Sequence, residues 1–311
     1  MCGIVCYVGK QKAKSILLEG LKRLEYRGYD SAGLAIQDGN HIDYHRAAGK
    51  IIELEKKVNG LDMKGTFGIA HTRWATHGEP IEKNAHPQMD QDENVFVIHN
   101  GIIENYYNLK KKLGKSGVTF RSETDTEVLA QLIALNFEGD LSEAVRKTMA
   151  QVEGTFGLAV IHRDTPGEIV VARRGSPLII GVGEDGNFAA SDVAAMVRYT
   201  NKVVHLNDNE LALLTRDGFS ISTAQAKTVQ RDTETVEWGE EDAELNGFPH
   251  FMLKEIYEQP ETVKNAIRGR LEAGEGVPKL GGITPVWENL KECRHMVIVA
   301  CGTSYYAGCV G

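Results

Sequence analysis

The chain has 311 residues, of which 42% are hydrophobic and 25% charged, and its formal net charge is −8. This length suits one large domain and part of a second, with the composition of an ordinary globular protein. The negative charge and the lack of long Lys/Arg runs exclude nucleic acid as an expected partner, because phosphate backbones are bound by clustered positive charge. No signal-like segment and no run of roughly 18 apolar residues occurs, so we expect a cytoplasmic protein without membrane contact.

The cysteines number five and lie near the two ends of the chain: Cys2, Cys6, Cys293, Cys301 and Cys309. No two of them form a CxxC pair, and none has the short Cys/His spacing of a zinc site. Cys2 and Cys6 share a strand face, but extended chain holds them roughly 13 Å apart, beyond the roughly 7 Å limit for a disulfide. We expect neither a disulfide framework nor a metal site, and no cofactor is implied.

In chain order, residues 2–9 predict a buried strand, and Ile16, Leu17, Leu21 and Leu24 predict a helix that ends before Arg27. Further strands are predicted at 33–36, 68–72 and 95–99, and helices at about 105–113, 125–138 and 141–151. Short strands follow at 158–161, 169–172, 178–182, 203–206 and 210–214. Strands grouped apart from helices predict an α+β fold, with sheets packed face to face and helices outside.

A second unit is predicted to begin near His250, after an acidic stretch from Glu234 to Glu244 that is typical of a linker. Residues 250–267 predict a helix that Pro260 bends or interrupts. Met296–Ala300 predicts a short apolar strand leading into Thr303 and Ser304. Hydroxyls and backbone N–H groups at that position suit a phosphate, or simply cap the next helix.

The second residue of the chain is a cysteine, which offers a specific chemical opportunity. Removal of Met1 would place a thiol and a free α-amine on Cys2. An α-amine has a reference pKa near 8, so it is partly neutral at pH 7 and can accept the thiol proton. Cys2 is then a nucleophile that carries its own base. The alternative interpretation is a buried strand residue without chemistry.

The segment 68–80, GIAHTRWATHGEP, predicts a strand that runs into a polar loop. Arg73 offers a planar fork suited to a carboxylate, while Trp74, Thr76 and His77 offer a wall and hydrogen-bond donors. Singly, a surface ion pair and a core tryptophan explain these residues. Their concentration within five positions favours a binding site.

Two other polar segments allow both a structural and a chemical interpretation. Asn100-Gly101 is typical of a type I′ hairpin turn, but a side-chain amide beside a backbone N–H also suits an oxyanion hole. Residues 122–127, SETDTE, fit a capping box at Ser122 with Asp125 and at Thr124 with Glu127, yet Asp125 remains able to bind an ammonium group. Arg27, Tyr29 and Asp30 either support Cys2 or form a hydrogen-bonded turn.

Taken together, the N-terminal CGI, LEYRGYDSAG, HTRWATHGEP, HNGIIEN and SETDTE resemble, in order and spacing, the class II glutamine amidotransferases. The resemblance covers nearly the whole chain and implies an N-terminal-nucleophile hydrolase fold, a four-layer αββα sandwich, at 2–240. It also implies a linker at 241–249. KEIYEQP (254–260) and ACGTS (300–304) resemble the entrance to a sugar-phosphate isomerase (SIS) domain, of which residues 250–311 would be the incomplete N-terminal part.

The resemblance also implies a role for each candidate site residue. Cys2 is the nucleophile and its α-amine the base. The oxyanion hole is formed by Asn100 Nδ2 and the Gly101 N–H. The substrate glutamine is bound by Arg73 at its α-carboxylate and by Asp125 at its α-ammonium, under a loop with Trp74, Thr76 and His77. Arg27 is a supporting residue, and Thr303 and Ser304 belong to an incomplete sugar-phosphate site.

The implied reaction hydrolyses L-glutamine to glutamate and ammonia, which a longer, homodimeric enzyme would deliver to fructose 6-phosphate. Because the chain stops at Gly311, we expect glutaminase activity without synthesis of the aminosugar. Met296–Ala300 would leave apolar surface without its usual neighbours. Another acceptor, or a silent glutamine-binding module, remains an alternative. Cys6 stands where the family pattern has glycine, and its side chain would crowd the site.

Overall fold

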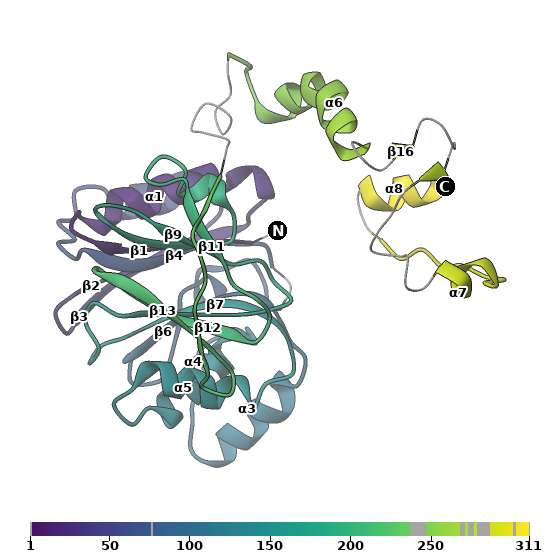
Figure 1. The fold of residues 1–311 in the computed structure, drawn as a ribbon. Helices are drawn as coiled ribbons and strands as arrows, with labels where there is room; N and C mark the ends of the chain where they lie inside the picture. The colour runs from purple at the N-terminus through teal and green to yellow at the C-terminus, as the bar shows by residue number, and fades with distance from the viewer. Residues whose placement is uncertain are drawn as a thin grey trace. The chain divides into compact units, whose positions relative to one another are not determined.

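The structure is a computed structural model that describes residues 2–75, 77–236, 247–267, 271–272, 277–278, 287–300 and 303–310 (Figure 1). The chain divides into two compact units, Met1–Asn246 and Gly247–Gly311. The first unit contains two large sheets, and every strand pair within them is antiparallel.

The first sheet has eight strands in the order β15-β11-β9-β10-β1-β4-β2-β3. Its central strand β1 begins one residue after Cys2 and pairs with β4 and β10. The strands are β1 (Gly3–Gly9), β2 (Ser31–Asp38), β3 (His41–Ala48), β4 (Phe67–Arg73), β9 (Ile179–Val182), β10 (Gly186–Ala190), β11 (Lys202–His205) and β15 (Glu234–Thr235).

The second sheet has seven strands in the order β14-β13-β12-β8-β7-β6-β5. Its longest strands, β6 and β7, pair along their whole length, from Val95 opposite His162 to Ile103 opposite Gly154. The strands are β5 (Gln88–Met89), β6 (Val95–Ile103), β7 (Gly154–His162), β8 (Ile169–Arg174), β12 (Glu210–Thr215), β13 (Gly218–Thr223) and β14 (Thr228–Val229).

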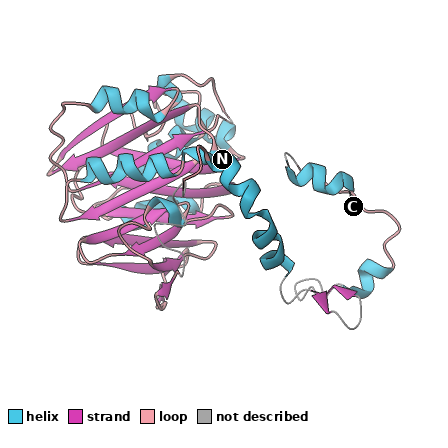
Figure 2. Ribbon diagram, turned by 90° about the horizontal axis from the view of Figure 1, so that it is seen from above, coloured by secondary structure: helices cyan, strands magenta, loops and turns pink. Residues whose placement is uncertain are grey.

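Helices cover the outer face of each sheet. The first sheet carries α1 (Ala13–Arg23) and α2 (Ile51–Val58), while α4 (Thr126–Asn136) and α5 (Leu141–Met149) pack on the second and α3 (Tyr106–Lys115) packs beside α4. Short 3₁₀ turns occupy Glu25–Arg27, Glu82–Asn84 and Val193–Ala195. The strands thus form two stacked layers with helices outside them (Figure 1), and Figure 2 looks onto helices that lie over the strands.

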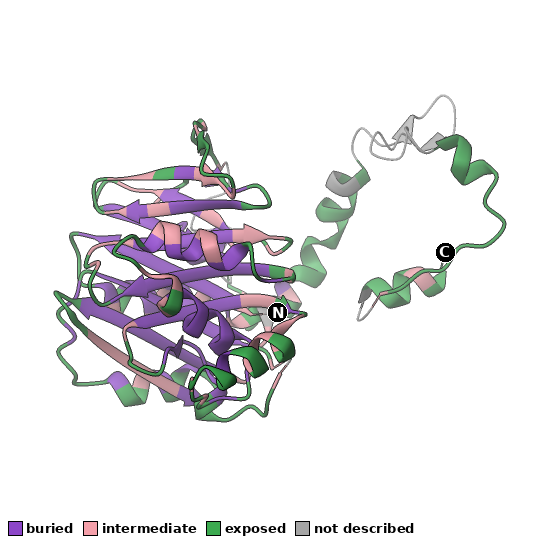
Figure 3. Cartoon of the chain, turned by 90° about the horizontal axis from the view of Figure 1, so that it is seen from below, coloured by how far each residue is buried: buried purple, intermediate pink, exposed green. Residues whose placement is uncertain are grey.

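Alternating side chains of β1 divide between two cores. Val5 and Tyr7 join the core beneath α1 and α2, whereas Ile4, Cys6 and Val8 join the core between the two sheets. Because successive strand residues point to opposite faces, a nearly continuous apolar run fills both cores. A third core lies under α4 and α5. Central strands of the first unit such as β1 are accordingly buried, whereas β3 is mostly half-buried and β15 is exposed (Figure 3).

The predicted α+β class with face-to-face sheets agrees with these layers, but several elements are missing from the prediction. β3, α2, β10 and β13 were not predicted. In β3 the sequence HIDYHRAA is polar, because this strand is last in the sheet order, pairs with β2 alone among the described strands and is mostly half-buried. The interpretation of residues 234–244 as a linker was wrong at its start, since Glu234 and Thr235 pair with β11. Residues 237–246 lie outside the described part.

The second unit contains α6 (Phe251–Ile267), a hairpin of β16 (Leu271–Glu272) and β17 (Val277–Pro278), α7 (Trp287–Lys291) and α8 (Thr303–Val310). Pro260 lies inside α6 and does not interrupt it. The predicted strand at Met296–Ala300 was wrong, because these residues have no strand assignment and pair with no strand among the described residues. An extended segment becomes a strand only when a neighbour accepts its backbone hydrogen bonds.

Candidate active site

A cavity of about 410 Å³ opens where the start of β1, the end of β4 and the second half of β6 meet. Its volume falls in the range of small-molecule sites, roughly 300 to 1,000 Å³. Among the described residues, it is lined by Cys2 and by residues of the polar segments around Arg73, Asn100 and Asp125, but by neither Tyr29 nor Asp30: Cys2, Arg73, Trp74, His77, His86, His99, Asn100, Gly101, Ile102, Thr124, Asp125, Thr126, Thr155, Ser176 and Pro177.

The thiol of Cys2 lies at the mouth of this cavity and contacts the loop after β4. Its Sγ accepts a hydrogen bond from the Trp74 N–H at 3.1 Å. Burial raises the pKa of the thiol, while the Trp74 N–H and the Arg73 charge oppose that shift. A thiol with a raised pKa is mostly protonated at pH 7, so nucleophilic attack requires a base.

Asn100 and Gly101 lie inside β6, opposite Gly157 and Phe156, and do not form a hairpin turn. The turn interpretation was therefore wrong. Gly101 has φ +138°, and a side-chain Cβ there would lie 2.1 Å from the Thr155 carbonyl oxygen, so only glycine fits. The Asn100 Nδ2 donates to the Cys2 carbonyl at 3.2 Å, which leaves its second proton available beside the nucleophile's residue.

Arg73 is 3% exposed and ends β4. Its Nη1 donates to the Glu79 carbonyl at 3.2 Å, and its Nη2 donates to the carbonyls of Gly78, at 3.2 Å, and His77. These bonds hold the loop after β4 against the guanidinium. A guanidinium has five N–H donors, so further donors remain for an anion in the cavity. Desolvation lowers the Arg73 pKa, and the Asp30 carboxylate opposes this shift.

Asp125 is 4% exposed, and its two carboxylate oxygens have different environments. Oδ2 accepts from the Ile103 N–H at 2.8 Å, whereas Oδ1 lies 3.9 Å from His77 Nδ1. His77 Nδ1 is buried without a hydrogen-bond partner. A carboxylate oxygen and an unsatisfied ring nitrogen therefore face the same part of the cavity.

Helix capping before α4 uses only part of the predicted pattern. The Glu127 N–H donates to Thr124 Oγ1 at 3.4 Å, and the Glu127 carboxylate accepts from the N–H groups of Arg121 and Ser122. The predicted pair of Ser122 with Asp125 does not form, because the Asp125 carboxylate is turned to Ile103 and the cavity. Capping thus explains Thr124 and Glu127 but leaves Asp125 for the site.

Asp30 supports the loop that contacts Cys2. Its carboxylate accepts from the Ala75 N–H, and its own N–H donates to the Arg73 carbonyl at 2.8 Å. Trp74 is 55% exposed and packs over Gly28, where φ is +87° and an added Cβ would lie 2.8 Å from the indole. The turn at 28–30 and the loop at 73–75 are therefore built against each other.

Several predicted positions receive no test from the described residues. Thr76 and the side chains of Arg27 and Thr303 lie outside the described part, and Ser304 is exposed in α8. Cys6 does not line the cavity; its side chain lies in the core between the sheets, so the expected crowding is absent from the described cavity wall.

The site also contains residues that sequence reasoning missed. Thr155, Ser176 and Pro177 line the cavity from β7 and from the connection between β8 and β9. These positions are brought to Cys2 only by sheet packing, and no local pattern indicates them. His71 and His99 stand within polar segments and His86 lies outside them, and the contacts that link the three through Thr126 could not be inferred from spacing.

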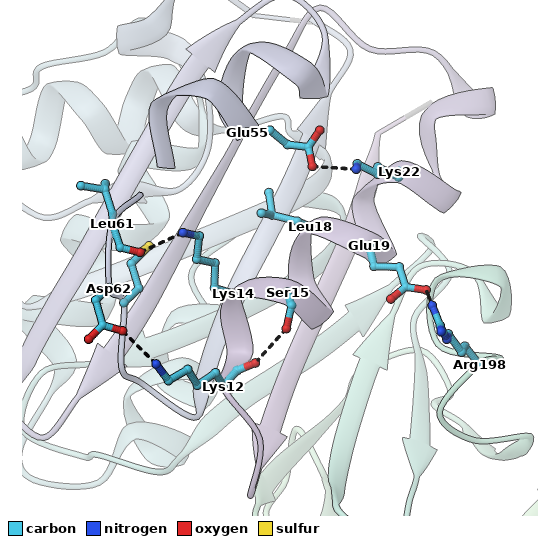
Figure 4. A pocket seen from close by; sticks show the side chains of 11 residues that line it. Lys12, Lys14, Ser15, Leu18, Glu19, Lys22, Glu55, Leu61, Asp62 and Arg198 are labelled. Carbon is cyan, nitrogen blue, oxygen red and sulfur yellow. Dashed lines mark hydrogen bonds and ion pairs between the residues drawn. The ribbon is translucent and has the colours of Figure 1, made fainter. Parts of the chain in front are cut away.

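A larger cavity of about 710 Å³ lies beside α1 (Figure 4). Its charged side chains neutralise one another: Lys12 contacts Asp62, Lys22 contacts Glu55, and Arg198 contacts Glu19. Lys14 donates to the Val58 and Leu61 carbonyls. The described residues of this wall include no thiol and no clustered unpaired charge, which distinguishes it from the cavity at Cys2.

The described residues include no cluster of His, Cys, Asp or Glu that could hold a metal ion. Within the same part of the chain, no helix is both long enough and apolar enough to cross a membrane.

Comparison with known proteins places the chain in a family. The model of the glutamine amidotransferase domain matches residues 57–246, a span that includes Arg73, Asn100, Gly101 and Asp125. The chain belongs to the class II glutamine amidotransferases.

Curated relatives match the chain along its whole length. Over its full length the chain is 49% identical to the glutamine–fructose-6-phosphate aminotransferase (isomerizing) of Aquifex aeolicus, 47% to that of Thermus thermophilus and 45% to that of Clostridium acetobutylicum. It spans about half of these relatives, 51% in each case.

A solved structure agrees in fold. The glutamine phosphoribosylpyrophosphate amidotransferase of B. subtilis matches with a TM-score of 0.64 and 26% identity, over 73% of this chain and 50% of that one. The first unit thus has the α+β fold of an N-terminal-nucleophile amidotransferase, with two antiparallel sheets.

Proposed function

We propose that this chain hydrolyses L-glutamine to glutamate and ammonia through a thioester on Cys2. The observation that supports this most directly is one cavity containing a thiol, an amide donor beside it, a buried arginine and a buried carboxylate. Cys2, Asn100, Arg73 and Asp125 come from four separate segments. Nucleophilic acyl transfer needs the thiol and the oxyanion donor, while the arginine and the carboxylate suit the α-carboxylate and α-ammonium of an amino-acid substrate.

The first half-reaction forms the thioester. With Met1 removed, the α-amine of Cys2 takes the thiol proton, and the thiolate attacks the side-chain amide carbon of glutamine. Asn100 Nδ2 and the Gly101 N–H stabilise the oxyanion of the tetrahedral intermediate. The proton held by the α-amine passes to the leaving nitrogen, so ammonia departs. The raised pKa of the buried thiol explains why a built-in base is necessary.

The second half-reaction consumes one water. The α-amine removes a proton from the water, whose oxygen attacks the thioester carbon in the same oxyanion hole. The carbon–sulfur bond breaks, glutamate leaves, and the thiol regains its proton. Arg73 binds the α-carboxylate and Asp125 the α-ammonium of the substrate, under the loop that contains Trp74, Thr76 and His77.

The second unit supports a wider role for the chain. We infer that residues 250–311 are the incomplete N-terminal part of an SIS domain, joined at 241–249 to a glutaminase at 2–240. In a homodimeric enzyme as long as these relatives, the ammonia would convert fructose 6-phosphate to glucosamine 6-phosphate. Thr303 and Ser304 would begin the sugar-phosphate site.

The test is ammonia and glutamate release from L-glutamine by the wild type, Cys2→Ala and Cys6→Ala. Cys6→Ala is the matched control, because it removes a thiol four residues along the chain, in the core between the sheets, without touching the cavity. Wild type and Cys6→Ala should release both products, and Cys2→Ala should release neither. Equal release by all three proteins would contradict the nucleophile, and release by none would favour a silent glutamine-binding module.

A further inference from the structure

Three buried histidines and a threonine connect Asn100 to the far wall of the cavity. Five contacts form an unbroken chain: His71 Nε2 to Asn100 Oδ1 at 2.8 Å, His86 Nδ1 to His71 Nδ1 at 3.0 Å, His86 Nε2 to Thr126 Oγ1 at 2.9 Å, His99 Nδ1 to the same Oγ1 at 3.1 Å, and His99 Nε2 to the Thr155 carbonyl at 3.3 Å. The proposed reaction uses none of these imidazoles directly.

All four side chains are buried, with exposures of 0% for His71, 4% for His86, 3% for His99 and 1% for Thr126, and the last three contribute to the cavity wall. Burial lowers the pKa of His71 to about 3 and the pKa of His86 well below its usual value. Burial also lowers the pKa of His99, against the opposing charge of Asp125. At neutral pH each ring is therefore uncharged and carries a single N–H.

The direction of each hydrogen bond follows from the Asn100 amide. Its Nδ2 donates to the Cys2 carbonyl, so its Oδ1 accepts, and the proton of His71 must lie on Nε2. His71 then has no N–H to offer to His86, so His86 donates from Nδ1. The rings meet at 60°, and His86 Nδ1 lies 3.0 Å from His71 Nδ1 and 3.4 Å from His71 Nε2, so this N–H points toward the face of the His71 ring.

The rest of the chain follows by the same rule. His86 Nε2 has no proton, so the Thr126 hydroxyl donates to it. The Thr126 oxygen accepts from His99 Nδ1–H. Both ends of the chain are carbonyl acceptors, so five contacts share the four protons of three neutral rings and one hydroxyl. We assign the missing proton to the contact of His99 Nε2 with the Thr155 carbonyl, because it is the longest of the five.

We propose that His71 and His86 are positioning residues that fix which end of the Asn100 amide faces Cys2. This inference rests on the proposed glutaminase and deepens it. If His71 carried its proton on Nδ1, its Nε2 would attract the Asn100 Nδ2. The amide would then turn its oxygen toward the Cys2 carbonyl and lose the oxyanion donor. The position of the proton on the His71 ring thus decides whether Asn100 presents a hydrogen-bond donor to the oxyanion.

The direct test is the tautomeric state of each ring, read from long-range ¹H–¹⁵N correlation spectra of the full chain labelled on histidine nitrogen. The chain has 10 histidines, and His71→Gln and His86→Asn assign two of them by loss of one signal set each. We expect the Nε2–H form for His71 and the Nδ1–H form for His86 at pH 7. The Nδ1–H form for His71, or a charged ring at either position, would overturn the proposal.

The kinetic test compares two amides at position 71. The His71→Gln amide reaches the position of Nε2 and can donate to Asn100, whereas that of His71→Asn reaches only the position of Nδ1. We expect His71→Asn to lower the glutaminase kcat about 10- to 100-fold with KM changed less than about threefold, and His71→Gln to restore most of kcat. His162→Gln, a buried histidine stacked on Phe137 outside the cavity, should leave kcat within about twofold.

A purely structural role for His71 predicts equal losses of kcat in both variants, and that result would contradict the inference. Failure of the proposed function gives a different pattern, because wild type would then release no ammonia while the tautomers of the wild-type rings remain measurable. Thermal unfolding of each variant identifies any protein that fails to fold. The spectrum of the wild type needs no variant fold and decides the matter alone.

Discussion

Two apolar runs of four residues have opposite environments in this chain. Val95–Ile98 in β6 are at most 1% exposed, whereas Met296–Val299 in the second unit are between 57% and 89% exposed. Their composition is nearly the same. The first run has strands β5 and β7 on its two sides and contributes to cores on both faces of the sheet. The second run pairs with no strand among the described residues.

The difference shows that an apolar run does not determine its own structure. Burying such a run is favourable by about 25 cal/mol per Å² of apolar surface, but only where other layers cover it. In the first unit the two sheets and their helices supply those layers. The same packing brings Asn100, which follows the buried run on β6, beside Cys2 in the cavity. Stability and the site therefore depend on the same strand.

The largest expected effect is on the glutaminase kcat, and it should follow a substitution in the first unit but not one in the second. Asn100→Ala removes one oxyanion donor and should lower the glutaminase kcat about 100- to 1,000-fold, or about 3 to 4 kcal/mol, with little change in KM. Ser304→Ala, in α8 of the second unit, should leave ammonia release unchanged. An Asn100→Ala protein with wild-type turnover would remove the role assigned to this residue.

A second comparison uses the same substitution in both runs. Val97→Ala empties space in a closed core and should lower the free energy of unfolding of the first unit by about 2 to 3 kcal/mol. Val297→Ala, at a position of the second unit that is 84% exposed, should change the free energy of unfolding of its own unit by less than about 0.5 kcal/mol. Denaturant unfolding measures both. Equal effects would show that the exposed run is covered in solution.

The smallest expected effect is pH-dependent and belongs to the first unit. The unfolded chain protonates His71 below pH 6.5, but the folded ring stays neutral down to about pH 3. Stability contributed by this residue is therefore lost as the pH falls through that window, by about 2 kcal/mol between pH 7 and 5. His71→Gln should reduce the measured loss over this range by about that amount. An unchanged pH dependence would mean that the buried ring becomes charged.

Local patterns predicted most of the long elements and the polar segments that form the site. The apolar runs at β1, β4, β6 and β7 and the periodicity of α4 and α5 were readable, because each buries one or both faces. Polar edge strands such as β3 were not, since one side of an edge strand meets solvent. Helix capping was correctly predicted within residues 122–127, but only the contacts in the structure show that the Asp125 carboxylate faces the cavity.

The contacts of the site across the two sheets were beyond sequence reasoning from the residues alone. Thr155 and Ser176 reach the cavity through strand pairing, and the chain from His71 to His99 depends on the registers of β4 and β6. The prediction of a strand at Met296–Ala300 was wrong for a related reason. An apolar run predicts burial but does not show which strands would pair with it.

The central claim is that Cys2, with its own free α-amine, carries the acyl group. The most direct measurement is mass spectrometry of the acid-quenched full chain after brief mixing with L-glutamine, followed by peptide mapping. We predict a γ-glutamyl group on an N-terminal peptide that begins at Cys2 and lacks Met1. Glutamine hydrolysis by a chain that retains Met1, or a glutamyl group on any other residue, would contradict the account.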